Sequence, residues 1–336
     1  MPDFKRILFL LIIILCFYVI YKLVQRRQVI LKDHENDNNE LEPFEGKVEI
    51  RPRIKNSENL RLPLKEYVIM SSFNSASNTE GTVSLSTLGN NLKRGYRFID
   101  LEIYLVDSQA QVSFSSVKPY DVMESEPILF LDVCKLIVKD GFATNNGDDP
   151  LLLHLRIKSK SPLIFEELAS ILQNECNTRL HKGKVTGDTI LSDIKSRLVI
   201  VVDRNYVPDI ENYKCSGKCR RDFKKMINMY SGVSEFESMK FIQKLDQPTR
   251  PLQKTEDSRT NVEKMQMVTH GLGELNIEKN GPEFYTLVKN YKVQVFPHKV
   301  YYKDEYLSVY EDFFKKYHRA FVPMTIAFDF LEEELD

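Results

Sequence analysis

The sequence predicts an α/β fold, a (β/α)8 barrel of the TIM type, preceded by one N-terminal transmembrane helix. Two observations support this expectation. Short β-rich runs alternate with helical stretches over most of the chain, as they do where crossover helices connect the strands of a parallel sheet. Ahead of them, residues 7–21 read ILFLLIIILCFYVIY, without a charge, a proline or a glycine.

Residues 1–25 are predicted to form a membrane anchor. The apolar run, continued through Lys22 to Val24, approaches the ~20 residues that a helix needs to cross a hydrocarbon core. A cleaved signal peptide is the competing interpretation, but the run exceeds a usual signal core and no small-x-small cleavage site follows it. A buried core helix would show an amphipathic stripe, whereas this run is apolar on all sides.

Charges and cysteines narrow the class of protein. Positive residues are more numerous after the apolar run than before it, which predicts a single-pass membrane protein with its globular domain facing the cytosol. A formal net charge of -1 argues against nucleic-acid binding by bulk charge. The 5 cysteines among 336 residues are too sparse for a disulfide framework.

The remaining chain divides into a linker, one large domain and a short tail. Residues 26–62 are predicted to be a polar stalk, because their few apolar residues follow no helical stripe. The barrel is expected over residues 63–330, with a tail at 331–336. Within the barrel, residues 205–285 are predicted to be irregular and rich in insertions, with one strand at 239–244.

The elements of the barrel follow from hydrophobic periodicity. Residues 96–106 alternate apolar and polar side chains, which predicts a strand with two distinct faces. Apolar residues recur every three or four positions at 162–176, which predicts a helix. The other expected strands are 65–72, 150–159, 196–203, 291–302 and 320–330, and the other expected helices are 84–95, 128–142 and 306–317.

Residues 67–74 read YVIMSSFN, and residues 95–104 read GYRFIDLEIY. These two segments resemble Tyr-x-Ile-x-Ser-Ser-His-Asn and Gly-x-Arg-x-x-Glu-x-Asp of the catalytic X region of phosphatidylinositol-specific phospholipase C. Residues 128–133 and 150–155 fall where that family has its helix and its fourth strand. The resemblance covers residues 63–330. It implies the barrel of a phosphoric diester hydrolase of lipid metabolism.

The resemblance also implies a reaction that uses two histidines and a calcium ion. One histidine takes the proton of the inositol 2-hydroxyl, the other assists the leaving group, and the calcium ion gathers negative charge. Phe73 stands at the first histidine position, and Phe114 (or Ser113, if the register slips) stands at the second. Phenylalanine transfers no proton, so no intact catalytic residue is expected, at a loss of ~10²–10⁴-fold for each histidine.

The sequence keeps part of the calcium site that the resemblance implies. Asn74 matches the family's asparagine ligand, and Asp100 and Glu102 match its two acidic ligands with the acid types exchanged. Arg156 replaces the fourth ligand, a glutamate, and is expected to pair with Asp100 or Glu102. No cofactor is therefore expected, and calcium only if the remnant site still binds it. Some metal-free bacterial relatives use an arginine in place of calcium, so Arg156 by itself leaves activity open.

Two histidines are candidate surrogate bases. His154 lies two residues before Arg156, so period-two geometry puts both on one face of the strand. His298 lies on the expected seventh strand. In both places a buried histidine that is simply hydrogen-bonded is the commoner situation.

The sequence leaves three alternative functions for this chain. The sequence favours a membrane-anchored pseudoenzyme that binds or scaffolds at a membrane surface, with a phosphoinositide or a protein as partner and no nucleic acid. The alternative is an active phosphoric diester hydrolase with a site rewired from Asp100, Glu102, His154 and Arg156. The third is a structural membrane protein of a large DNA virus particle, in a host or virion membrane, and it rests on analogy alone.

Overall fold

The computed structural model describes residues 61–78, 81–115, 123, 125–213, 222–242, 247–248, 264–270 and 284–333. All of them belong to the unit Gly46–Asp336. The predicted anchor at 1–25 and nearly all of the predicted stalk lie outside these residues. Within them, no helix is both long and apolar enough to cross a bilayer.

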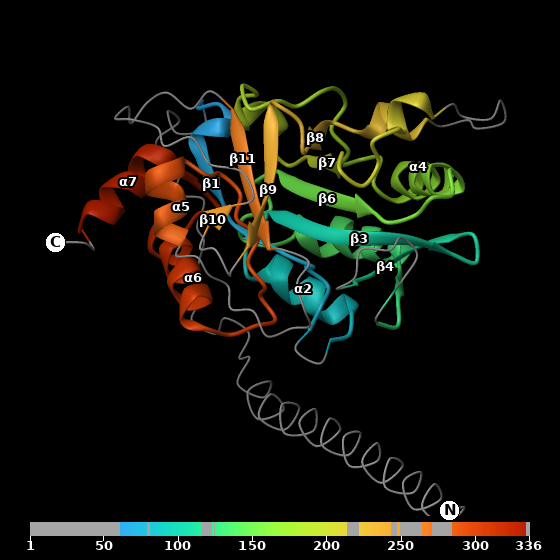
Figure 1. Cartoon of the computed structure of the whole chain (residues 1–336), viewed down its shortest axis with the longest axis horizontal. Helices are drawn as coiled ribbons and strands as arrows, with labels where there is room; N and C mark the ends of the chain where they lie inside the picture. The colour runs from blue at the N-terminus through green and yellow to red at the C-terminus, as the bar shows by residue number, and fades with distance from the viewer. Residues whose placement is uncertain are drawn as a thin grey trace, which may run out of the picture. The chain divides into compact units, whose positions relative to one another are not determined.

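A parallel sheet forms one wall of the domain (Figure 1). β2 (Ser71–Ser72) and β6 (Leu151–Ile157) pair in parallel with the two edges of β3 (Phe98–Val106). β7 (Leu198–Asp203) pairs with β6, and β8 (Met229–Ser231) pairs with β7. All side chains of β6 and β7 are buried, as is typical of parallel strands that are covered on both faces.

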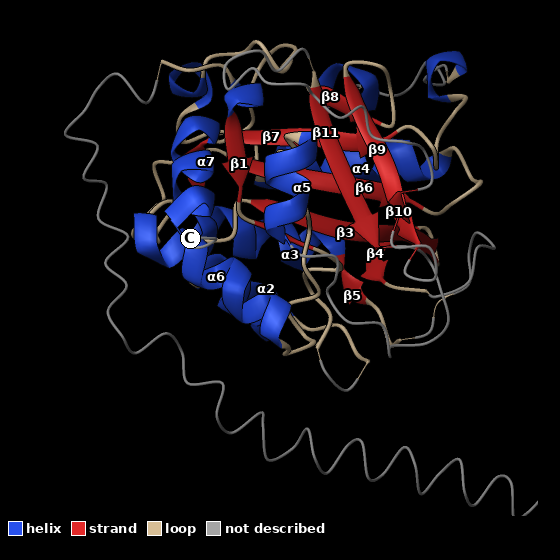
Figure 2. Ribbon diagram, turned by 60° about the vertical axis from the view of Figure 1, so that its left-hand side comes forward, coloured by secondary structure: helices blue, strands red, loops and turns tan. Residues whose placement is uncertain are grey.

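A second set of strands closes the ring. β9 (Phe236–Ile242) pairs in parallel with β11 (Met265–His270), and Figure 2 shows both crossing in front of β3, β6 and β7. Isolated parallel bridges then connect β11 to Val295, and Val295 to β1 (Tyr67–Ile69). The fold is TIM-barrel-like, but bridges replace the continuous strand expected at 291–302.

Helices cover the outside of the strands. Ser84 caps α2 (Leu85–Lys93), and Gly95 turns the chain out of the helix at φ 96°, a conformation that favours glycine. α2 and α4 (Leu163–Glu175) confirm the helices predicted at 84–95 and 162–176. The remaining helices are α3 (Phe130–Leu136) with a π-helical extension at Ile137–Gly141, α5 (Phe284–Tyr291), α6 (Glu305–Tyr317) and α7 (Met324–Glu333).

Two segments differ from the prediction. A hairpin was missed where β3 turns through Asp107 and Ser108, both at positive φ, into the antiparallel β4 (Gln109–Ser113). The strand predicted at 320–330 is wrong beyond Pro323. Only β12 (Phe321–Pro323) is extended, antiparallel to β1, and α7 follows because its apolar residues repeat at helical spacing and pack against α5.

Short elements complete the fold. The 3-10 turns are Leu64–Glu66, Leu191–Ile194, Ile210–Asn212 and Phe223–Met226. The short strands are β5 (Ile128–Leu129), on β4, and β10 (Gln247–Pro248), on β9. In the stretch predicted to be irregular, the strand expected at 239–244 is β9, and β8, β10 and β11 were not foreseen.

Candidate functional site

The strand register brings the predicted site residues together inside the barrel. β3 and β6 run in parallel with Asp100 beside His154 and Glu102 beside Arg156. Because side chains alternate along a strand, all four point to the same side of the two strands. Their side chains are almost completely buried, at 0% relative exposure for the first three and 3% for Arg156.

The guanidinium of Arg156 is at the centre of this cluster. Its Nε and one terminal nitrogen donate to the two oxygens of Asp100 at 2.9 and 2.6 Å. The other terminal nitrogen donates to Glu102 Oε1 at 2.6 Å, and Asn74 Oδ1 accepts a further bond at 2.6 Å. Arg156 thus forms the predicted ion pair with both carboxylates, and its contact with Asp100 is bidentate.

A second cation, which the prediction missed, completes the cluster. Lys158 follows β6, is 1% exposed, and places Nζ 2.6 Å from Glu102 Oε2. The hydroxyl of Tyr104 and the backbone N–H of Ser115 also donate to this oxygen, at 2.7 and 3.0 Å. The period-two spacing of His154, Arg156 and Lys158 within the strand predicted at 150–159 was the available signal, although β6 itself ends at Ile157.

Burial and pairing act against each other on the pKa values in the cluster. Burial raises the pKa of Asp100, but Arg156 and the hydrogen bond from His154 outweigh it and hold that pKa below its usual range. Burial lowers the pKa of Arg156, and the two carboxylates more than reverse this. Burial lowers the pKa of Lys158. Arg156 and Asp100 are therefore charged throughout the physiological pH range.

The two positions of the lost histidines are apolar and buried. Phe73 is 6% exposed, and its ring centroid lies 4.5 Å from Arg156 Cζ, a cation–π contact. Phe114 follows β4 and is 8% exposed. Ser113, the alternative position, donates its hydroxyl to the backbone carbonyl of Ser125 at 3.0 Å. Phe73 therefore covers the guanidinium in addition to lacking a transferable proton.

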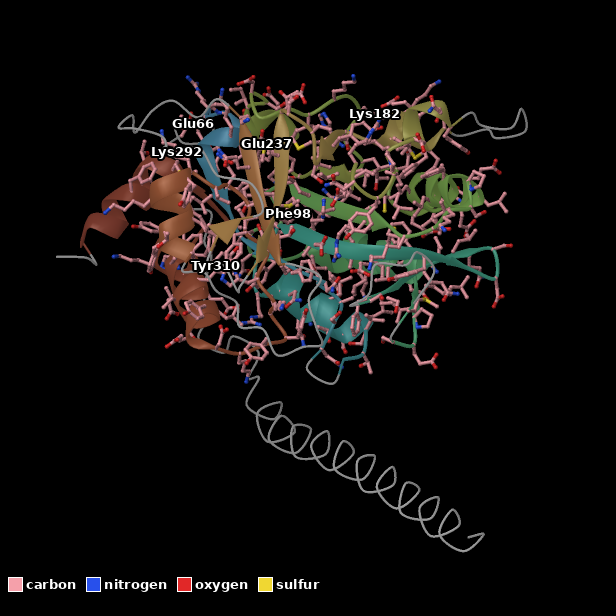
Figure 3. The ribbon with its side chains drawn as sticks, in the orientation of Figure 1. Glu66, Phe98, Lys182, Glu237, Lys292 and Tyr310 are labelled. Atoms are coloured by element: carbon pink, nitrogen blue, oxygen red, sulfur yellow. The ribbon has the colours of Figure 1, made fainter. Side chains whose placement is uncertain are left out.

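His154 lies between two polar partners, Asp100 of the predicted rewired site and Ser231. Its Nδ1 is 2.7 Å from Asp100 Oδ1, and its Nε2 is 2.8 Å from the hydroxyl of Ser231 at the end of β8. Since the ionised Asp100 only accepts, the neutral ring with its proton on Nδ1 satisfies both bonds. The ring packs 5.2 Å from that of Phe98, which Figure 3 labels on β3. Ser231 was missed because β8 lies in the stretch predicted to be irregular.

His298 is placed in an apolar environment. Its ring stacks on that of Tyr310 from α6, with centroids 3.8 Å apart, and Figure 3 labels Tyr310. Nδ1 lies 3.1 Å from the carbonyl of Phe296, whereas Nε2 has no hydrogen-bond partner among the described residues. Burial lowers the pKa of His298 to about 3, so the ring is neutral at physiological pH and a poor proton acceptor.

Calcium does not fit this arrangement. The oxygens that would ligate it, from Asn74, Asp100 and Glu102, are the same ones that accept hydrogen bonds from Arg156. Nor do the described residues contain any other group of three or more His, Cys, Asp and Glu side chains that could hold a metal ion.

Comparison with known proteins agrees with the fold and the motifs. Residues 60–202 match the family model for the X domain of phosphatidylinositol-specific phospholipase C. Residues 60–202 are therefore similar to that X domain, as the two sequence motifs predicted. No curated protein matches it in sequence.

Two solved structures share the fold with TM-scores above 0.5. PLC21 of L. pealei aligns with a TM-score of 0.57 and 14% identity, and PLC21 of S. officinalis with 0.57 and 15%. Each alignment covers 79% of this chain and 37% of the PLC21 chain, so this chain spans little more than a third of those relatives. The phosphatidylinositol-specific phospholipase C of Listeria monocytogenes aligns with a TM-score of 0.47 and 11% identity, over 75% of this chain and 94% of that one.

Proposed function

We propose that this chain is a membrane-tethered phospholipase C-like protein that binds or scaffolds at a membrane surface and does not hydrolyse phosphodiesters. The proposal combines three features. The cluster inside the barrel is closed, the proton carriers of the family are replaced, and an apolar run long enough to anchor the chain precedes the domain.

The observation that carries the proposal is that all four oxygens of the two carboxylates already have hydrogen-bond or ion-pair partners. Asp100 Oδ1 accepts from Arg156 and lies within hydrogen-bonding distance of His154, and Oδ2 accepts from Arg156 and the N–H of Asn74. Glu102 Oε1 accepts from Arg156, and Oε2 accepts from Tyr104, Ser115 and Lys158. A substrate hydroxyl or phosphate would have to break buried, charge-assisted bonds to reach these groups.

The chemistry of general acid–base catalysis gives independent support. A proton carrier at the reacting centre must titrate near the working pH, and Phe73 and Phe114 do not titrate at all. His298 is neutral, since its pKa is lowered to about 3. His154 is already within hydrogen-bonding distance of both Asp100 and Ser231. None of these four side chains is poised to move a proton to and from a lipid headgroup.

The test uses the full-length chain in mixed micelles of detergent and phosphatidylinositol. Release of inositol phosphate is measured with and without calcium, and flotation with phosphatidylinositol vesicles measures binding. We expect vesicle association without turnover. Turnover that is lost in Arg156→Ala or His154→Ala would overturn the proposal. If the native chain shows no turnover, the double substitution Phe73→His and Phe114→His tests whether the rest of the site can still support the reaction.

One observation favours a second candidate, a hydrolase with a rewired site. Asp100, His154 and Ser231 lie in a hydrogen-bonded line, in which the imidazole could accept the proton of the serine hydroxyl. Ser231 is 0% exposed, however, so a substrate would need the barrel to open. Turnover that disappears in Ser231→Ala, in a variant that remains folded, would establish this candidate over the first.

A further inference from the structure

Two cations occupy the centre of this barrel, and their combined charge equals that of the two carboxylates they contact. Asp100 and Glu102 contribute two negative charges, and Arg156 and Lys158 contribute two positive charges through ion pairs of 2.6 Å each. His154 is neutral when its proton lies on Nδ1, which both of its hydrogen bonds permit. With His154 in that form, the charges of the buried cluster sum to zero.

The oxygen atoms in the cluster would suit a hard divalent cation if Arg156 were absent. Four oxygens from three side chains converge on one guanidinium: both from Asp100, one from Glu102 and one from Asn74. Carboxylate and amide oxygens are the ligands that Ca²⁺ takes in proteins. Asn74 also has a positive φ of 43°, and its backbone N–H donates to Asp100, so this side chain is held by the backbone as well as by Arg156.

We propose that Arg156 and Lys158 together replace a divalent cation in this barrel, and that the oxygens around Arg156 form a closed cation site. Arg156 lies in β6 and Lys158 is the first residue after it, so one short stretch of chain supplies the whole +2 charge. Neither side chain alone balances the carboxylates. The inference does not depend on whether the chain hydrolyses lipid.

Charge arithmetic identifies the variant that reopens the site. Arg156→Glu leaves three carboxylates and Lys158, a net charge of −2, which one Ca²⁺ neutralises. Arg156→Gln leaves two carboxylates and Lys158, a net charge of −1, so a bound Ca²⁺ would leave an uncompensated buried positive charge. The two variants remove the same guanidinium with side chains of nearly equal size, which makes Arg156→Gln the matched control.

The experiment measures thermal unfolding of the full-length chain in detergent, in EDTA and in calcium chloride, with potassium chloride at matched ionic strength. We expect the native Tm to be the same in both. Arg156→Glu should have a lower Tm in EDTA and gain about 5–10 °C when calcium is a hundredfold above its Kd. Arg156→Gln should have a lower Tm and show no such gain. Calorimetric titration with calcium chloride should give heat of binding for Arg156→Glu alone.

Three results would overturn the proposal. The first is a native chain that calcium stabilises or EDTA destabilises. The second is a folded Arg156→Glu chain whose Tm does not rise in calcium chloride. The third is a calcium response in Arg156→Gln as large as that in Arg156→Glu.

If Arg156→Glu does not fold under either condition, a second pair of variants tests the same claim without metal. Lys158→Met leaves the cluster with one unbalanced negative charge and should lower the Tm by roughly 6 °C or more. Lys160→Met is its control, because Lys160 is an exposed lysine two residues further along. Equal Tm values for these two variants would show that Lys158 is not part of the charge balance, and would overturn the proposal.

Discussion

Asp100→Asn is the substitution that tests the electrostatics of the cluster most directly. It keeps the size of the side chain and removes one charge from a group that contacts Arg156 twice and His154 and Asn74 once each. An asparagine side chain has only one acceptor oxygen. Its amide nitrogen must therefore face the donors of Arg156 and Asn74 at one position, or those of Arg156 and His154 at the other.

The expected loss is large because the cluster is buried. Breaking a buried ion pair by changing one partner costs about 3–5 kcal/mol, which is a fifth or more of a typical native stability of about 5–15 kcal/mol. The loss has a defined pH dependence. The pKa of Asp100 is lower in the folded chain than its unfolded value of about 3.9, so the stability it contributes is complete above that pH and is lost as the pH falls below it.

The assay is urea unfolding of the full-length native chain and the variant, followed by circular dichroism at several pH values between 7 and 3. The difference in the free energy of unfolding should be constant from pH 7 to about 5 and should shrink as the pH falls through 4. Asp132→Asn, at a half-exposed carboxylate in a pair with Lys135 at 3.6 Å, should change stability by less than about 1 kcal/mol. A difference for Asp100→Asn that is small at pH 7, or independent of pH, would refute the reasoning.

Three further substitutions test other contacts of the site. The pKa of His298 is about 3 in the folded chain, below its unfolded value, so this residue makes the chain less stable as the pH falls from about 6 to 4. His298→Phe should remove that part of the pH dependence. Urea titrations in which the free energy of unfolding falls with pH as steeply as in the native chain would contradict this. Ser231→Ala should lower the free energy of unfolding by about 1–3 kcal/mol, since it leaves His154 Nε2 buried without its partner; an unchanged urea midpoint would show that this bond is not needed. Phe73→Leu should lose about 0.5–2 kcal/mol from the contact with Arg156 beyond the packing change, as measured against Phe114→Leu, and equal losses would argue against the cation–π contribution.

Residues of the site that lie on long, regular strands could be placed from the sequence. Asp100 and Glu102 share a face of β3, as His154 and Arg156 share a face of β6, because side chains alternate in any strand. The ion pair of Arg156 with the acidic residues was expected from the resemblance, which puts all three at one calcium site, and it is present. Period and charge are local properties, so they can be read without knowing which strands become neighbours.

Residues contributed by irregular segments could not be placed in this way. Ser231 ends a strand of only three residues, and Ser115 binds Glu102 through its backbone N–H, which no side-chain pattern reveals. Lys158 was open to prediction, because it shares the period-two spacing of His154 and Arg156 in the strand predicted at 150–159. The segment 320–330 was assigned the wrong structure because a short apolar run fits a buried strand and a packed helix equally well.

By itself, the sequence determined which chemical groups this protein has and lacks. Phe73 and Phe114 carry no titratable proton, Arg156 carries a permanent positive charge, and residues 7–24 are uncharged apart from Lys22. Only the tertiary structure decided what the remaining charges do. A carboxylate in water and one saturated by Arg156 and Lys158 differ in pKa and in capacity to bind a ligand. That difference arises from burial and from neighbours distant in the chain, which exist only once the barrel has closed.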